Sequence, residues 1–138
     1  MSNNQPIFSK VGDIQWSGAT VSGANTTKDL TTGTTYSVFH ADPTSGGYVQ
    51  RIRFKSLGTN QATVARVWLN NGSTTSASEN NTLFDEVSLS ATTNSETSAL
   101  STTELPLNFA LPPGYKIYVT LGVTASAGYD VTVIGGKY

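Results

Sequence analysis

The chain has 138 residues, which corresponds to one domain that is large enough to bury a core without disulfide bonds or structural metal ions. Only 12% of its residues are charged and the formal net charge is -1, so no long-range field would recruit nucleic acid or an anionic membrane surface. The absence of cysteine excludes a disulfide framework and thiolate chemistry.

The amino-terminal stretch MSNNQPIFSKVGDIQW lacks the apolar core of a signal peptide, and no run of about 18 apolar residues occurs elsewhere in the sequence. We therefore expect a soluble protein that is synthesised in the cytoplasm and does not bind a membrane. Residues 1–138 are expected to form a single β-sandwich domain, in which residues 1–12 are a candidate extended N-terminal segment.

Short runs of alternating apolar and polar residues fill the chain, and clusters of Gly, Pro, Asn and Ser separate them, as expected of half-buried strands. No stretch has helical periodicity over three turns. The expected strands, in chain order, are 14–16, 19–22, 35–40, 47–55, 63–70, 82–89, 105–110, 115–121 and 129–134. This number of strands in one domain predicts an all-β fold, an antiparallel, jelly-roll-like β-sandwich of about eight strands.

Turn signals and loops punctuate these strands. The sequence Pro112-Pro113-Gly114 predicts a tight turn before the strand 115–121, in which apolar residues alternate clearly with Lys116, Tyr118 and Thr120. Two segments rich in Ser, Thr and Asn, 71–81 and 90–104, are expected to be long exposed loops.

Catalytic and metal-binding residues are scarce. The one histidine, His40, is expected at a strand end near Asp42, where a surface role is favoured over catalysis. One histidine without cysteine cannot form a zinc site, and Asp85 and Glu86 would point to opposite faces of a strand. We therefore expect no catalytic residues, no metal site and no cofactor.

Half of the basic residues lie in the stretch 47-GYVQRIRFKSLGTNQATVARVWLNNG-72, which is predicted to form a β-hairpin with its turn at residues 57–62. An even turn length places residues whose numbers sum to 119 opposite each other. In that register Arg53 faces Arg66 on one side of the hairpin. On the same side Arg51 faces Trp68, where a cation–π contact is expected.

Two facing arginines would repel each other unless a carboxylate lies over them. One possibility is cover within the subunit by Asp85, Glu86 or Glu104, and the other is an acidic surface on another subunit or another protein. The predicted interface residues are Arg51, Arg53, Arg66 and Trp68.

Four phrases carry a resemblance to a known family: YVQRIRFKSLGTNQATVARVWLNNGS (48–73), TLFDEVSLSATT (82–93), ELPLNFALPPGYKIYVTLG (104–122) and YDVTVIGGKY (129–138). They resemble small β-rich structural proteins of tailed bacteriophages, most closely the capsid decoration or cement proteins. The likeness lies in the sequences of the expected strands and in a composition rich in Thr, Asn and Gly. It covers the chain from about residue 25 onward.

The resemblance implies a β-sandwich or jelly-roll module without enzymatic activity or cofactor. Such a module sits on the capsid surface of the virion, binds the major capsid protein, bridges capsomers and commonly forms a homotrimer. Tail-fibre, tail-tip and baseplate modules share the same texture. The alternative function is therefore carbohydrate binding for host attachment, for which Trp16, Trp68 and tyrosines would supply stacking surfaces.

Overall fold

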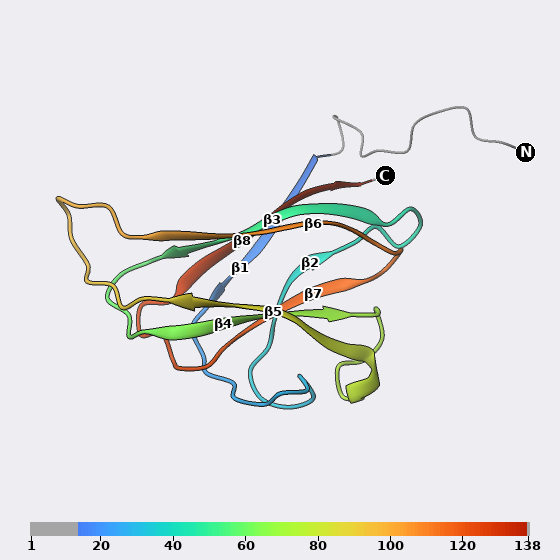
Figure 1. Cartoon of the computed structure of the whole chain (residues 1–138), viewed down its shortest axis with the longest axis horizontal. Helices are drawn as coiled ribbons and strands as arrows, with labels where there is room; N and C mark the ends of the chain where they lie inside the picture. The colour runs from blue at the N-terminus through green and yellow to red at the C-terminus, as the bar shows by residue number, and fades with distance from the viewer. Residues whose placement is uncertain (1–13, 138) are drawn as a thin grey trace, which may run out of the picture.

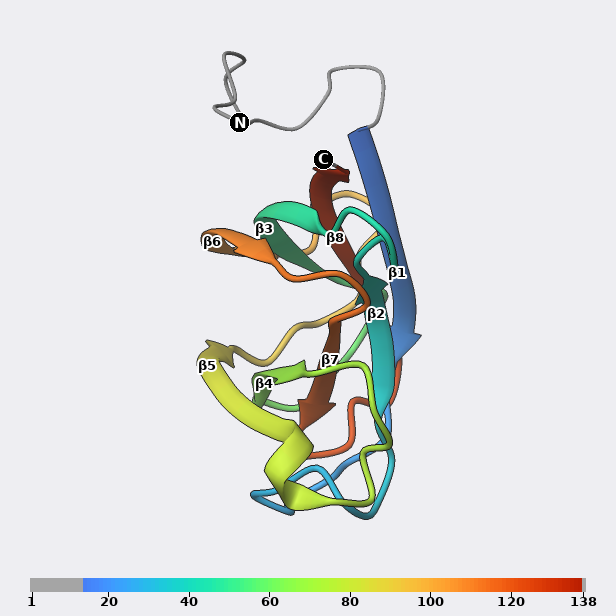
Figure 2. The ribbon, with the colours of Figure 1, turned by 90° about the vertical axis from the view of Figure 1, so that its right-hand side faces the viewer.

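The computed structural model describes residues 14–137, which form two four-stranded sheets packed face to face (Figures 1 and 2). The strands are β1 (Ile14–Val21), β2 (Tyr36–His40), β3 (Gly47–Ser56), β4 (Thr63–Asn70), β5 (Asn81–Leu89), β6 (Thr102–Leu111), β7 (Lys116–Leu121) and β8 (Tyr129–Lys137). The only helical element of this part of the chain is a short 3-10 helix, Ser78–Asn80. The predicted β-sandwich of about eight strands is confirmed, whereas the expected N-terminal segment 1–12 lies outside the described residues.

The strand order is β1-β8-β3-β6 in one sheet, here called sheet A, and β2-β7-β4-β5 in the other, sheet B. Every named strand pair is antiparallel. Each connection between consecutive strands crosses from one sheet to the other, except the connection from β4 to β5. Neighbours in the sequence are therefore mostly partners across the core and not within a sheet.

Most strand boundaries follow the sequence pattern. The two short strands expected at 14–16 and 19–22 are one continuous strand, β1, because Gly18 pairs with Thr132 without interrupting the ladder. The turn before β7 is confirmed, since the Tyr115 N–H donates to the Pro112 carbonyl at 3.2 Å and Gly114 adopts a φ of 80°.

The predicted hairpin of residues 47–72 is wrong, because β3 lies in sheet A and β4 lies in sheet B. The intervening segment does not form a tight turn but is attached to distant loops. The Asn60 amide donates to the Gly128 carbonyl at 3.0 Å and its oxygen accepts the Ala127 and Gly128 N–H groups, while its backbone pairs with Thr92. This buried asparagine directs the chain across the sandwich instead of back along β3.

The core lies between the inner faces of the two sheets. Sheet A contributes Ile52 and Phe54, which alternate with outward-pointing Arg51 and Arg53. Sheet B contributes Val67, together with the inward residues of β7. The largest side chains of this cluster are fully buried, as expected for a close-packed sandwich interior.

The two sheets form a wedge. Figure 2 shows them close together at the side of β1 and β2 and separated at the side of β5 and β6. Across the separated side, the rings of Phe84 from β5 and Phe109 from β6 meet with centroids 4.9 Å apart. We call this side of the sandwich, between β5 and β6, the open side.

Part of the outer face of sheet B is covered by the chain itself. The segment 22–35 starts beside the end of β7, where the Asn25 N–H donates to the Leu121 carbonyl, and reaches β5, where Asn81 donates to the Asp29 carbonyl. It then returns to β2, passing below sheet B in Figures 1 and 2. Leu30, at a φ of 64°, is buried in this segment although it is not part of the main core.

Candidate functional site

The predicted interface residues do not share one face. Arg51 and Arg53 lie on the outer face of sheet A, where their neighbours on β6 are Pro106 and Glu104. Arg66 lies on the outer face of sheet B, opposite Glu86 of β5. The two facing arginines of the predicted hairpin are therefore separated by the whole thickness of the sandwich.

Glu104 covers the two arginines of sheet A. Its carboxylate oxygens lie 3.7 Å from the Nε atoms of Arg51 and of Arg53, and the side chains of all three residues are between 41 and 48% exposed. The Nε of Arg51 is buried and has no hydrogen-bond partner among the described residues. Two cations thus share one carboxylate at ion-pair distance, which leaves a net positive charge. We call Arg51, Arg53 and Glu104 the arginine face.

Arg66 has a carboxylate of its own. Its Nε donates to Glu86 at 2.9 Å, and only 13% of the Arg66 side chain is exposed. Cover within the subunit, one of the two possibilities raised by the sequence, is thus supplied by Glu86 and Glu104. Asp85 does not take part: its carboxylate accepts the Glu86 N–H at 2.8 Å and makes no ion pair with any residue that the structure describes.

Trp68 is buried, with 1% of its surface exposed, and its indole N–H donates to the Thr120 hydroxyl at 3.0 Å. The expected contact between Arg51 and Trp68 is therefore wrong, because the two residues lie on different sheets. Because its side chain is buried, Trp68 offers no exposed ring for stacking on a sugar at the surface of the single chain. Trp16 belongs to β1, where its backbone pairs with Ile134.

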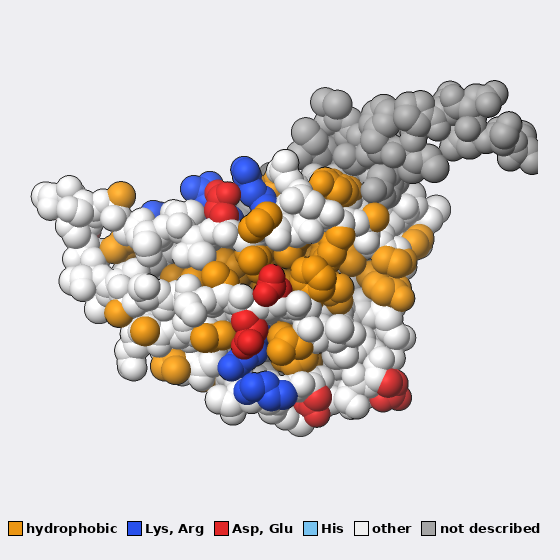
Figure 3. Space-filling view, viewed as in Figure 1, with side chains coloured by type: hydrophobic (Ala, Val, Ile, Leu, Met, Phe, Trp, Pro, Cys, Tyr) orange, Lys and Arg blue, Asp and Glu red, His pale blue; other side chains and the backbone are white. Residues whose placement is uncertain are grey.

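The open side exposes apolar residues that line the core. Phe84 is 42% exposed, while Val87, Leu105 and Phe109 are half-buried and pack against the core cluster. We call these four residues the apolar stripe. Figure 3 shows hydrophobic side chains gathered between the two sheets on this side, with acidic residues beside them.

Both strands that border the apolar stripe are irregular edges. The β4–β5 register shifts at Phe84, and β6 bulges near Asn108, which has a φ of 51°. Pro106 removes one backbone donor from β6. Bulges and proline discourage the addition of a further strand, so the open side presents side chains more readily than backbone hydrogen-bonding groups.

The β4–β5 pairing places Asp85 beside the apolar stripe. It lies opposite Val67, whose side chain points into the core, so the Asp85 side chain projects to the inner side of sheet B at its edge. The stripe therefore combines exposed apolar surface with one carboxylate. The sequence did not reveal this site because alternation alone does not show which strands end up at the edges of the sheets.

No hydrogen bond joins His40 and Asp42 among the contacts of the described residues. His40 ends β2 and is exposed. The Asp42 carboxylate accepts the backbone N–H groups of Ser45 and Thr44 at 2.8 and 2.9 Å, which holds its pKa below the ordinary value. Through its Oδ1 atom it organises the turn that leads into β3.

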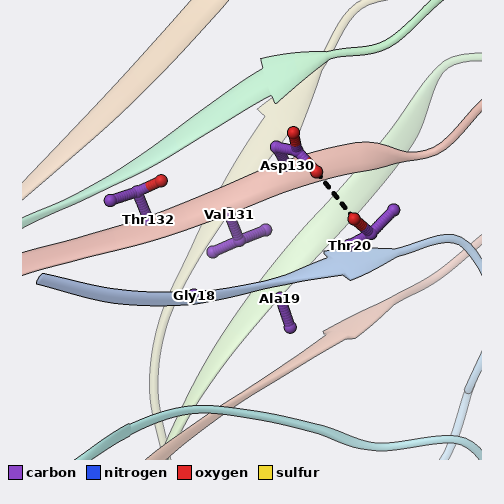
Figure 4. A pocket seen from close by; sticks show the side chains of 6 residues that line it. All are labelled: Gly18, Ala19, Thr20, Asp130, Val131 and Thr132. Atoms are coloured by element: carbon purple, nitrogen blue, oxygen red, sulfur yellow. Dashed lines mark hydrogen bonds between the residues drawn. The ribbon is translucent and has the colours of Figure 1, made fainter.

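Several shallow hollows lie on the surface. One, of about 270 Å³, follows β1 and β8, where Figure 4 shows the Thr20 hydroxyl and Asp130 pointing toward one another at 2.7 Å. Another, of about 510 Å³, lies beside Arg66, and a third, of about 340 Å³, is bordered by Arg51, Glu104 and Pro106. Within the described range, no cluster of His, Asp and Glu could hold a metal ion, and no helix is long and apolar enough to span a membrane.

Comparison of the chain with models of known protein families, with curated proteins and with solved structures finds no match.

Proposed function

We propose that this chain is a non-enzymatic structural protein of a tailed-bacteriophage virion, a decoration or cement protein that binds the major capsid protein on the capsid surface and bridges capsomers. We further propose that it acts as a homo-oligomer, most simply a homotrimer. The resemblance of its strand phrases to such proteins motivates the assignment, and features of the fold support it.

The strand pairing favours the jelly-roll arrangement that the resemblance implies. β1 pairs with β8, β2 with β7, β3 with β6 and β4 with β5, all antiparallel. A double-sheet jelly roll of eight strands would have the same nested pairing. A fold of this kind hosts many functions, so it supports the proposal at the level of architecture only.

The exposed apolar surface of the open side is the observation that best supports a binding role. The described residues leave Phe84 exposed and Leu105 and Phe109 half-buried at an edge of the core that none of them covers. Contiguous exposed apolar surface beside charged residues is typical of protein–protein contact sites. A protein whose function is to attach to other subunits has a use for such a surface.

The test is co-sedimentation of the purified protein with capsids assembled from the major capsid protein of the phage that encodes it. We expect saturable binding, which falls as salt is added because exposed charge pairs are screened. Protein that stays in the supernatant at every salt concentration overturns the capsid assignment. Binding to host surface polysaccharide in a parallel pull-down, without capsid binding, would instead favour the host-attachment module.

A further inference from the structure

We propose that the apolar stripe of one copy docks on the arginine face of a second copy, where Asp85 of the first pairs with Arg53 and Arg51 of the second. This inference deepens the proposed homo-oligomer by assigning the two surfaces through which it forms.

The donating surface has an apolar patch and an unpaired acid. Phe84 is the most exposed aromatic residue of the apolar stripe, and Asp85 follows it directly. The Asp85 carboxylate has no cationic partner among the described residues. A suitable occupant therefore supplies some apolar cover together with a positive charge.

The accepting surface has the complementary features. Arg51 and Arg53 share Glu104 at 3.7 Å each, beyond hydrogen-bonding distance, so their guanidinium groups retain donors for a second carboxylate. The shallow hollow beside them is bordered by Pro106 and Asn108, which offers space for a projecting side chain such as Phe84. An arginine next to such a ring can also form a cation–π contact.

The two surfaces belong to different sides of the same subunit, so the contact is head-to-tail. They adjoin along β6, which borders the open side and also carries Glu104 on its outer face. Successive copies therefore turn relative to one another, which favours a small closed ring over a straight filament. A ring of three copies satisfies both surfaces of every subunit.

The experiment measures the mass of the full chain by light scattering during size-exclusion chromatography, over a concentration series that reaches ~1 mM, the effective concentration typical of tethered partners. Asp85→Arg and Arg53→Asp should each weaken association by about tenfold or more, because each replaces an attraction with a repulsion. Glu96→Arg and Lys28→Asp are the matched controls, since both change an exposed charge away from the two surfaces and should leave the mass unchanged.

The doubly reversed variant Asp85→Arg/Arg53→Asp decides whether the two residues meet. If they do, the reversed charges attract again across the contact, and association should return to within about threefold of the parent. Circular dichroism of all variants checks that each of them is folded. A parent that remains a monomer throughout the series overturns the proposal, and so does a double variant that associates no better than either single one.

Mixing the two single variants is a second test of the contact. Each contact between unlike variants brings opposite charges together, whereas each contact between like copies brings like charges together. An equimolar mixture should therefore associate more strongly than either variant alone, and a mixture that associates no better would contradict the contact. The parent forms a ring of three. A parent that stops at two copies would contradict the head-to-tail ring.

The outcomes also separate this inference from the proposed function. A monomer that binds capsids overturns the self-docking and leaves the capsid assignment in place. A ring that forms through these surfaces but does not bind capsids overturns the capsid assignment and leaves the self-docking in place.

Discussion

Two regions carry apolar side chains at the margins of the main core, and they differ in whether another part of the chain covers them. Trp68 is buried but lies outside the main core, on the side of sheet B that the segment 22–35 crosses on its way from β7 to β5 and back (Figure 2). At the open side, Phe84 and Phe109 contact each other and remain partly exposed. The first region is covered by the chain itself, and the second has no cover from the residues that the structure describes.

The covering segment shows what intramolecular cover requires. Asn25 is buried and uses its whole amide: the nitrogen donates to the Thr32 and Thr34 carbonyls, and the oxygen accepts the Thr27 N–H and hydroxyl. Ordering such a segment costs conformational entropy, which these hydrogen bonds and the burial of Leu30 offset. Within residues 14–137 no comparable segment covers the open side, which is why we assign its cover to another copy.

The largest expected effect comes from the covered region. Trp68→Ala should lower the free energy of unfolding by about 3 to 5 kcal/mol, because it leaves a cavity beneath the segment and removes the bond to Thr120. Leu83→Ala is the control: this residue lies opposite Trp68 on β5 but is 37% exposed, and it should cost less than about 1 kcal/mol. Urea titration measures both, and equal losses would show that Trp68 is not held under effective cover.

Asn25→Ala should be next in size. Loss of its four hydrogen bonds should lower the free energy of unfolding by about 2 kcal/mol, since these bonds hold the two ends of the segment together in a partly buried place. In a Trp16→Phe background, the fluorescence of Trp68 should shift to longer wavelength as the segment loosens. Asn25→Asp keeps the acceptor but turns a carboxylate oxygen toward the two carbonyl oxygens, so a loss at least as large is expected. An unchanged spectrum in both variants would contradict the covering role.

Phe84→Ser tests how much the open side contributes to the stability of the single chain. In the single chain it removes one half-exposed ring and its contact with Phe109, so the free energy of unfolding should fall by only about 1 kcal/mol. Thermal unfolding at a concentration too low for association measures this. A loss as large as that of Trp68→Ala would mean that the open side is part of the core of the isolated subunit.

The smallest expected effect is a pH dependence of the covering segment. Hydrogen bonds from the Thr31 backbone and hydroxyl lower the pKa of Asp29 from its ordinary value of 3.8. A carboxyl group whose pKa is lower in the folded state contributes stability that is present above pH 3.8 and is lost as the pH falls through the folded value. Acid titration of the parent and of Asp29→Asn should show a slightly smaller loss below pH 3.8 in the variant, and identical curves would contradict this role.

Local pattern was enough to predict the elements but not their partners. Ile52 and Val67 both point into the core, as the alternation of their strands requires, yet they do so from opposite sheets. A hairpin and a pair of strands facing each other across a sandwich satisfy that alternation equally well. The length of the segment 57–62 suited a turn, but β3 and β4 belong to different sheets, and Asn60 ties the segment to residues far along the chain.

The sequence by itself thus determined an all-β chain, the strands, the turn at Gly114 and the presence of carboxylates able to cover the arginines. Only the tertiary structure decided that Glu104 covers Arg51 and Arg53, that Glu86 covers Arg66, and that Trp68 is buried while Phe84 is exposed. The reason is that alternation fixes which side of a strand a residue occupies. Whether that side is covered depends on which strand becomes an edge and which segment folds over it, and both result from pairings between residues distant in the sequence.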